Sequence, residues 1–349
     1  MLLRGLKLTR TIIFSTFFMA QISSPLPQLQ NDQQFQKGMA FPTWMSKQYG
    51  SPDSDKSLSI LAKTTYTEWV QFVPTWYQKD RFSNKMSPDY NGLTARKKCL
   101  RHAIQTAHNL GLKVMLKPHV DALNEDWRGT FQPTNSRIWF KNYKKMIKSY
   151  AKLANEEGVE ILSVGCEFLN LTKPKFTSQW KKIIKLIRKH YQDPLVYSAN
   201  WWKEYEQVEF WGELDYIGID AYFELTDKTD PTLAELLTSW KPYVVEIEVF
   251  YYTWQIPVIF TEIGYRSTDG ANMNPWAWKK KGKVDLEEQA LCYKAVKKTF
   301  KEKPWLEGIY WWHWVPDPEA GGATDTGYTP QNKPAVKILK KWYRESNQF

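Results

Sequence analysis

Short apolar runs alternate with amphipathic stretches along most of the chain. The runs that are rich in β-branched and aromatic residues fit strands, at residues 38–44, 68–76, 113–120, 160–167, 195–200, 215–222, 257–264 and 308–314. Between them, apolar residues recur at helical spacing in a stretch ending near Gly111, at about 136–155 and 178–190, after Pro231, and at 285–301 and 334–344. Strands that alternate with helices in this way predict a parallel sheet with helical crossovers.

Eight such units close into a barrel, so we predict an α/β protein with a single (β/α)8 TIM barrel at residues 38–345. The length without an N-terminal leader fits the range of ~200 to 400 residues for this fold. A doubly wound open sheet is the alternative. No GxGxxG or GxxxxGK loop follows any of the strands, and no composition break suggests a second domain, so one barrel is favoured.

The N-terminus has the pattern of a secretory signal peptide. Arg4, Lys7 and Arg10 precede the apolar residues 11–20, and a polar stretch follows. We therefore predict a signal peptide at residues 1–24, with the mature protein secreted or periplasmic. The apolar segment is shorter than the ~20 residues of a spanning helix, and an uncleaved N-terminal anchor is the alternative. Beyond such an anchor, we expect no stable membrane partner.

Composition narrows the classes of partner. The 18 Trp, 19 Tyr and 17 Phe suit ligands that stack on flat rings. The formal charge of +11 comes largely from lysine runs that interleave apolar residues at helical spacing, which is typical of solvated helix faces. No nucleic-acid module is visible, so we expect no nucleic-acid partner. Cys99, Cys166 and Cys292 are too irregularly spaced for a disulfide scaffold or a zinc ribbon, and we interpret them as buried thiols.

The reactive groups of such a barrel cluster where the strands end. The last residues of the eight runs are Trp44; Trp76 and Tyr77; Lys117 and His119; Glu167; Asn200, Trp201 and Trp202; Asp220 and Tyr222; Glu262; and Trp312 and Trp314. Glu167 and Glu262 follow strongly apolar strands, where a carboxylate is costly without partners. A buried salt bridge to Lys117 or Arg266 would explain them structurally. The pair together with the aromatic residues indicates instead glycoside hydrolysis, which needs two carboxyl groups.

Several segments carry a resemblance to a known family. They are Gly38-Met-Ala-Phe, Ser163-Val-Gly-Cys-Glu167, Asp215-Tyr-Ile-Gly-Ile-Asp-Ala-Tyr-Phe223, Phe260-Thr-Glu-Ile-Gly-Tyr-Arg266 and Asp325-Thr-Gly-Tyr-Thr-Pro-Gln-Asn-Lys-Pro-Ala335. In this order the chain resembles glycoside hydrolase clan A, and most closely the β-mannanases of family 113. The resemblance implies that Glu167 is the acid/base and Glu262 the nucleophile of a retaining enzyme. Many clan A enzymes carry Asn before the acid/base, whereas this chain has Cys166, which leaves recognition of the sugar 2-hydroxyl unassigned.

Physical requirements add the surrounding residues. We expect Tyr222, His119 and Lys117 to keep Glu262 ionised, and apolar surroundings with a negative neighbour to keep a proton on Glu167. We expect the Trp312 ring to lie beneath the sugar ring, and Asn200 to bind substrate. Trp44, Trp76, Trp201 and Trp202 are candidate platforms for neighbouring sugars. No second His or carboxylate lies at ligand spacing from His119, so we predict no metal and no cofactor.

The function that the resemblance implies is a retaining endo-β-1,4-mannanase, and we expect it to act on a polysaccharide or oligosaccharide as a monomer. Another β-glycanase on the same barrel, such as a β-1,4-glucanase, is one alternative. A carbohydrate-binding barrel without catalysis is the other, although such a binder would have no need for both glutamates.

Overall fold

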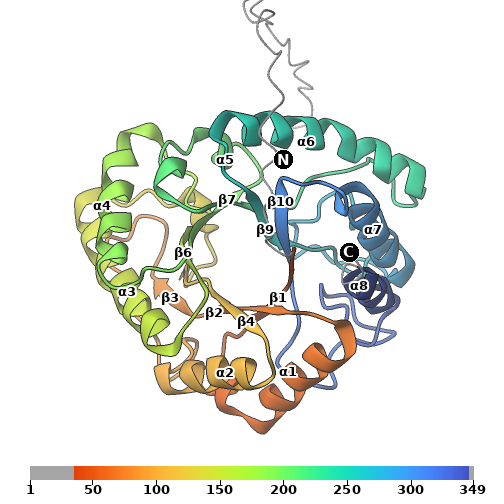
Figure 1. The fold of residues 1–349 in the computed structure, drawn as a ribbon, viewed down its shortest axis with the longest axis horizontal. Helices are drawn as coiled ribbons and strands as arrows, with labels where there is room; N and C mark the ends of the chain where they lie inside the picture. Colours follow the sequence, from red (N-terminus) through yellow and green to blue (C-terminus); the bar gives the residue numbers. More distant parts are fainter. Residues whose placement is uncertain (1–34, 346–349) are drawn as a thin grey trace, which may run out of the picture. The chain divides into compact units, whose positions relative to one another are not determined.

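Eight parallel strands close into a barrel in the computed structural model, which describes residues 35–345 (Figure 1). Around the barrel the order is β1 (Gln36–Pro42), β10 (Leu306–Trp311), β9 (Val258–Ile263), β8 (Tyr216–Asp220), β7 (Leu195–Asn200), β6 (Ile161–Cys166), β4 (Lys113–Leu116) and β2 (Trp69–Val73). The predicted single (β/α)8 barrel is thus confirmed. The predicted signal peptide at residues 1–24 lies outside the described residues.

Two of the eight predicted runs are longer than the barrel strands that they form. The prediction of one unbroken strand at 68–76 and at 113–120 was wrong, because Pro74 and Pro118 have no N–H to donate to the ladder. The residues beyond them form a separate parallel pair, β3 (Thr75–Gln78) and β5 (His119–Ala122). This small sheet extends the second and third barrel strands past the barrel.

Helices surround the barrel (Figure 1). They are α1 (Pro52–Thr65), α2 (Lys97–Asn109), α3 (Ser136–Glu157), α4 (Thr177–Arg188), α5 (Glu204–Gln207), α6 (Leu233–Trp254), α7 (Leu286–Phe300) and α8 (Pro334–Glu345). Short 3-10 turns lie at Gln48–Gly50, Arg128–Thr130, Pro174–Phe176 and Trp211–Glu213. The strand and helix pattern did not predict α1 and α5, whereas the other six helices match the predicted stretches.

The barrel interior and the layer between barrel and helices form two separate apolar cores. The interior cluster draws one residue from each of six strands: Met115, Ile161, Val196, Tyr216, Ile259 and Tyr310. Gly38 borders this cluster, because a Cβ there would lie 2.5 Å from the Tyr310 ring. The outer layer contains the largest fully buried side chains, among them Trp139, Trp180, Trp211, Trp240, Trp305 and Trp311. Much of the aromatic content therefore packs the core instead of binding ligands.

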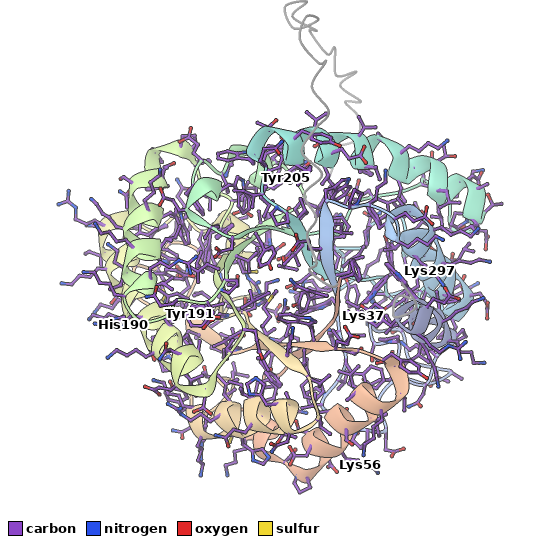
Figure 2. The ribbon with its side chains drawn as sticks, in the orientation of Figure 1. Lys37, Lys56, His190, Tyr191, Tyr205 and Lys297 are labelled. Carbon is purple, nitrogen blue, oxygen red and sulfur yellow. The ribbon has the colours of Figure 1, made fainter. Side chains whose placement is uncertain are left out.

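The positive charge lies on exposed helix faces, as the sequence predicted. Lys181, Lys182 and Lys185 of α4 are exposed, and Lys181 pairs with Glu213 at 2.9 Å. Figure 2 shows Lys56 and His190 at the periphery of the molecule, whereas Lys37 lies close to the barrel. All three cysteines are buried free thiols. Within residues 35–345, no helix combines the length and the apolar character that crossing a membrane requires.

Candidate active site

Glu262 lies in β9, close to the carboxyl end of the strand. Ile219 pairs with Phe260 and the next residue of β8, Asp220, pairs with Glu262, so Thr261 is the extra residue of a β-bulge. Bulges re-aim side chains and are frequent beside active sites. Only 6% of the Glu262 side chain is exposed, so its carboxylate requires partners.

Two donors hold the Glu262 carboxylate. The Tyr222 hydroxyl donates to Oε2 at 2.7 Å, which confirms the expected hydrogen bond, and the Lys117 ammonium donates to Oε1 at 2.6 Å. His119 Nε2 lies 3.7 Å from the same Oε1 and has no hydrogen-bond partner among the described residues. Burial, followed by the charges of Arg128 and Lys117, lowers the pKa of His119 well below its usual value. The imidazole is therefore neutral, and Nε2 is available to a sugar hydroxyl.

Lys117 joins Glu262 to a second buried carboxylate, Asp220. The ammonium donates to Asp220 Oδ1 at 2.8 Å, and the Thr261 hydroxyl donates to the same oxygen at 2.7 Å. Burial, and then the charge of Glu262, raises the pKa of Asp220 to about 7 against the opposing effect of Lys117. Burial alone would lower the pKa of Lys117, but Asp220 and its other anionic neighbours raise it, so the lysine stays charged.

Glu167 follows β6 directly, with a left-handed backbone at φ 51°. Non-glycine residues adopt this conformation rarely, and it clusters at functional sites. The Asn200 side-chain amide donates to Oε1 at 2.6 Å, and Arg128 Nη1 lies 3.7 Å from Oε2. Burial raises the pKa of Glu167, the charge of Arg128 opposes this, and the charge of Glu262 raises it further. These are the surroundings expected of a carboxyl group that holds a proton.

A third buried glutamate supports Asn200 from behind. Glu204 of α5 accepts the Asn200 backbone N–H at 2.7 Å and the hydroxyls of Tyr197 and Thr172 at 2.7 and 3.0 Å. Burial raises the pKa of Glu204 to about 8. Since the Asn200 side-chain oxygen also accepts the Trp202 N–H, the amide nitrogen is oriented toward Glu167.

Cys166 lies close to both glutamates. Its sulfur accepts from Arg128 Nη1 at 3.1 Å and donates to Asp220 Oδ2 at 3.4 Å. A carboxylate oxygen of Glu167 and one of Glu262 each lie within 4.8 Å of this sulfur. Arg128, which also donates to Asp121 at 2.6 Å, therefore connects the surroundings of both carboxyl groups.

Among residues 35–345, three groups of side chains have the ligand types for a metal ion. Two overlap in the site, His119 with Cys166 and Glu262, and Cys166 with Glu167 and Asp220. There, the cationic groups of Lys117 and Arg128 already contact the same acceptors, which opposes binding of a cation. The third is Asp269 with Asp285 and Glu288, where the Glu288 carboxylate accepts the N–H groups of Gly270 and Asn272.

Two tryptophans lie beside this cluster. The Trp312 ring stacks on His119 with centroids 6.3 Å apart, and Trp44, 41% exposed, meets Trp312 edge-on at the same centroid distance. Gly264 permits the approach, because a Cβ there would lie 2.4 Å from the Trp312 carbonyl oxygen. Trp314, one of the last residues of the eighth predicted run, lies beyond β10, which ends at Trp311, and its indole donates to Ser57 of α1.

The other predicted platforms differ in exposure. Trp202 is 46% exposed, with the Lys203 ammonium 4.4 Å from its ring centroid. Trp201 is partly buried, packs against the outer core and meets Phe223. The Trp76 indole is partly buried too and donates to Tyr150 of α3 at 3.0 Å. Trp44 and Trp202 thus present the larger free faces, while Trp201 and Trp76 each contact another aromatic side chain of the protein.

The site combines two carboxyl groups in different electrostatic surroundings with a wall of aromatic rings. One carboxyl group accepts from an ammonium and a hydroxyl, whereas the pKa of the other is raised. Two carboxyl groups with different surroundings are what glycosidic bond cleavage needs.

The family model for Glycoside Hydrolase Family 113 matches residues 39–333. The chain belongs to glycoside hydrolase family 113. This membership makes it a glycoside hydrolase and confirms the family resemblance of its sequence motifs. A search of curated proteins found no match.

Solved structures agree with family 113. A GH113 β-mannanase from Alicyclobacillus acidocaldarius, in complex with ManMIm, is similar at a TM-score of 0.82 and 26% identity, covering 90% of this chain and 99% of that one. A complex structure of a GH113 β-1,4-mannanase is similar at a TM-score of 0.81 and 25% identity, and the match covers 89% of this chain and 99% of that one. A β-glucuronidase from Ruminococcus gnavus shares the fold at a TM-score of 0.62 and 11% identity. The match covers 88% of this chain and 50% of that one.

Sequence reasoning missed two residues of the candidate site. Asp220 was recognised as a strand end but was given no role, and Arg128 was not singled out. Arg128 lies in a loop, in the 3-10 turn Arg128–Thr130, and carries no local motif that would have separated it from surface arginines. Its importance comes from its contacts with Cys166, Asp121 and Glu167, which are distant in sequence or lie beyond the predicted strand ends.

Proposed function

We propose that this protein is a retaining endo-β-1,4-mannanase that uses Glu167 as acid/base and Glu262 as nucleophile. The observation that carries the proposal is the contrast between the two carboxyl groups. Glu262 accepts from Lys117 and Tyr222, whereas burial and a neighbouring negative charge raise the pKa of Glu167. The family 113 relatives of known structure are named as mannanases, which favours β-mannan as the substrate.

In the first step, Glu262 attacks the anomeric carbon while Glu167 protonates the leaving oxygen. The glycosyl–enzyme ester then reacts with water, and Glu167 removes the proton from that water as a base. This mechanism requires carboxyl groups about 5–5.5 Å apart, whereas an inverting enzyme needs roughly 6.5–9.5 Å. We expect the short separation.

The neighbouring side chains have defined tasks in this proposal. Trp312 provides an apolar face beneath the sugar, and the unpaired Nε2 of the neutral His119 binds a hydroxyl. Cys166 occupies the position that is Asn in many clan A enzymes. Because its thiol is buried against Asp220 and Arg128, we assign hydroxyl recognition to His119 and Asn200 instead.

Hydrolysis assays with one purified sample on mannan, glucomannan, cellulose and xylan test the substrate. We expect reducing sugar from mannan and glucomannan, and none above the level of a Glu262→Gln control from cellulose or xylan. Hydrolysis confined to cellulose would point to a β-1,4-glucanase, and binding without hydrolysis of any polymer would point to a carbohydrate-binding barrel. Either result would contradict the proposal.

We also propose that the protein acts outside the cytoplasm, since the first 24 residues have the pattern of a signal peptide. We propose separately that it acts as a monomer. Mass spectrometry of the protein recovered after export should show loss of this leader. Light scattering of the purified chain should give a mass near that of one copy. An intact N-terminus would indicate the uncleaved anchor instead.

A further inference from the structure

Two loops from opposite sides of the barrel approach each other at the end that carries the site. Residues 264–285 connect β9 to α7, and residues 123–135 connect β5 to α3. In the barrel order, β9 and β4 are separated by four positions out of eight, which places them opposite each other (Figure 1). Because β5 continues β4 beyond Pro118, its loop starts on the side facing β9 across the mouth.

The contact between these loops is an ion pair. The Lys279 ammonium pairs with the Glu125 carboxylate, and both side chains are more than half exposed. A second contact fixes the same part of the β9–α7 loop, because the Trp276 indole donates to Glu224 Oε1, after β8, at 2.9 Å. The tip of the loop is thus attached both to the neighbouring strand's loop and to the loop across the mouth.

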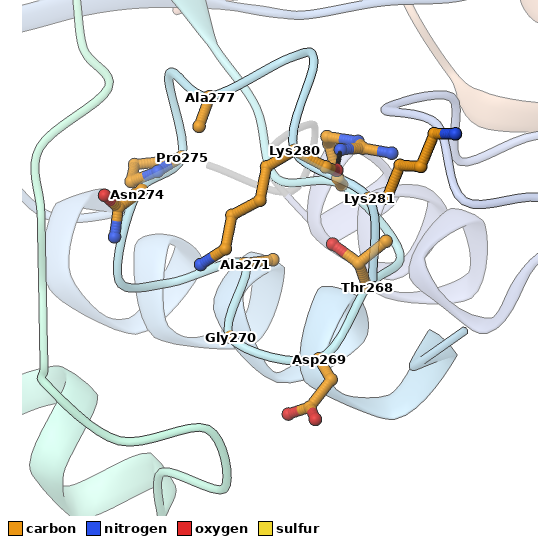
Figure 3. A pocket seen from close by; sticks show the side chains of 10 residues that line it. Thr268, Asp269, Gly270, Ala271, Asn274, Pro275, Ala277, Lys280 and Lys281 are labelled. Carbon is orange, nitrogen blue, oxygen red and sulfur yellow. Dashed lines mark hydrogen bonds between the residues drawn. The ribbon is translucent and has the colours of Figure 1, made fainter. Parts of the chain in front are cut away.

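The base of the β9–α7 loop is ordered by its own contacts. Figure 3 shows the loop folding around a small hollow lined by Thr268, Asp269, Asn274 and Lys280. Arg266 donates to the backbone carbonyl groups of Thr326 and Lys280, and buried Glu288 accepts two backbone N–H groups of the loop. A base held in this way fixes the position from which Lys279 reaches Glu125.

Exposed tryptophans flank the ion pair on both loops. Trp276 and Trp278 are 49% and 61% exposed, and Trp127, two residues after Glu125, is 39% exposed. The Lys279 ammonium lies 4.7 Å from the Trp278 ring centroid. Aromatic rings of this kind provide faces on which pyranose rings stack, so both ends of the contact have the chemistry of a sugar-binding surface.

We propose that the Glu125–Lys279 pair closes a bridge across the barrel mouth and thereby sets the preference between short and long substrates. The inference rests on the proposed function. With the bridge closed, an oligosaccharide or a chain end passes beneath it, whereas an internal linkage of a long chain reaches the glutamates only after the pair opens. Exposed ion pairs contribute little to stability, so the bridge opens in solution and slows attack on long chains without abolishing it.

Charge reversal tests the bridge. The variants are Glu125→Lys, Lys279→Glu and the double exchange, with Lys283→Glu as the control for an equal charge change in the same loop. The measured quantity is the ratio of kcat/KM on soluble mannan to kcat/KM on a short manno-oligosaccharide. We expect each single variant to raise this ratio by about threefold, the size of effect that an exposed ion pair supports. The double exchange, which restores opposite charges, should return the ratio to that of the wild type, and the Lys283 control should not change it.

Three outcomes would contradict the bridge: single variants with the wild-type ratio, a double exchange that does not restore it, or a Lys283 control that shifts it equally. Each of these leaves the proposed function intact, because hydrolysis still occurs. Absence of hydrolysis by the wild type on both substrates would instead overturn the proposed function, and the bridge with it.

Discussion

The two glutamates of the site owe their different behaviour to a few neighbours. Lys117 and Tyr222 contact one carboxylate, and Asn200 and Arg128 contact the other or lie beside it. Lys117 and Tyr222 donate to Glu262, whereas burial raises the pKa of Glu167. At the scale of single residues, the proposed chemistry therefore depends on the donors that contact Glu262 and on the burial that raises the pKa of Glu167 against the opposing charge of Arg128.

Removing either carboxylate should cost activity, because each has a separate task. We expect Glu167→Gln and Glu262→Gln to lower kcat/KM on an activated aryl mannoside by at least about 100-fold. Azide should restore turnover to Glu167→Ala and give the β-glycosyl azide, because the anion attacks the glycosyl–enzyme without a general base, whereas in Glu262→Ala it can only displace the aryl group directly and give the α-glycosyl azide. Wild-type activity in either Gln variant would remove that residue from the mechanism.

Replacing Arg128 should move the pH profile. The charge of Arg128 lowers the pKa of Glu167, so Arg128→Gln should raise that pKa. Since Glu167 is the acid of the first step in the proposed mechanism, the high-pH limb of kcat/KM should shift to higher pH. Arg101→Gln, which disrupts ion pairs with Glu156 and Glu157 on the surface, is the control and should leave the limb in place. A shift to lower pH would contradict the assignment.

Residues at strand ends were accessible to sequence reasoning, and residues in loops were not. Glu167, Glu262 and Tyr222 follow or end apolar runs, and the contact between Tyr222 and Glu262 was predicted from the need for a donor. Trp76 also ends such a run, and its indole contacts α3. The strand pattern did not predict this contact, because it does not give the direction of a side chain beyond a proline. Arg128 needed the tertiary structure.

At the scale of elements, prolines and helix caps explain the differences from the predicted pattern. Pro74 and Pro118 end two barrel strands. The sequence alone could have predicted these ends, because proline has no N–H to donate within a sheet. The start of α1 was equally readable: Ser51 accepts the Ser54 N–H, Pro52 is at the first turn, and Asp53 and Asp55 follow. Its apolar face is short, so periodicity alone did not reveal it.

Trp312 lies beside the site where the ends of the neighbouring strands β9 and β10 meet. This close approach depends on Gly264. A Cβ at this position would lie 2.4 Å from the Trp312 carbonyl oxygen, a backbone atom that cannot rotate away. We expect Gly264→Ala to lower the free energy of unfolding by about 1–3 kcal/mol, as overpacking does, and to lower kcat/KM through displacement of Trp312. Urea unfolding and kinetics measure both effects.

Gly212 offers the matched control, because a Cβ there would meet no atom within 4 Å. Gly212→Ala should leave both stability and activity close to those of the wild type. Equal losses in the two variants would mean that the contact with Trp312 is not the cause.

At the scale of the molecule, the barrel brings together carboxyl groups that are far apart in sequence. Glu167 and Glu262 come from β6 and β9, three positions apart in the barrel order, and Cys166 lies within 4.8 Å of an oxygen of each. The alternation of strands and helices predicted this convergence in outline. The loops that cross the mouth and the share of tryptophans that pack the outer core follow from tertiary contacts, which periodicity does not encode.

The stereochemistry of the product tests the central claim most directly. Proton NMR can follow the anomeric signals during the first minutes of hydrolysis of a manno-oligosaccharide, before mutarotation mixes them. A double displacement through Glu262 inverts the anomeric carbon twice, so the first product at the cleaved end should be the β-anomer. Initial formation of the α-anomer would show single inversion and would contradict the assignment of Glu167 and Glu262 as acid/base and nucleophile.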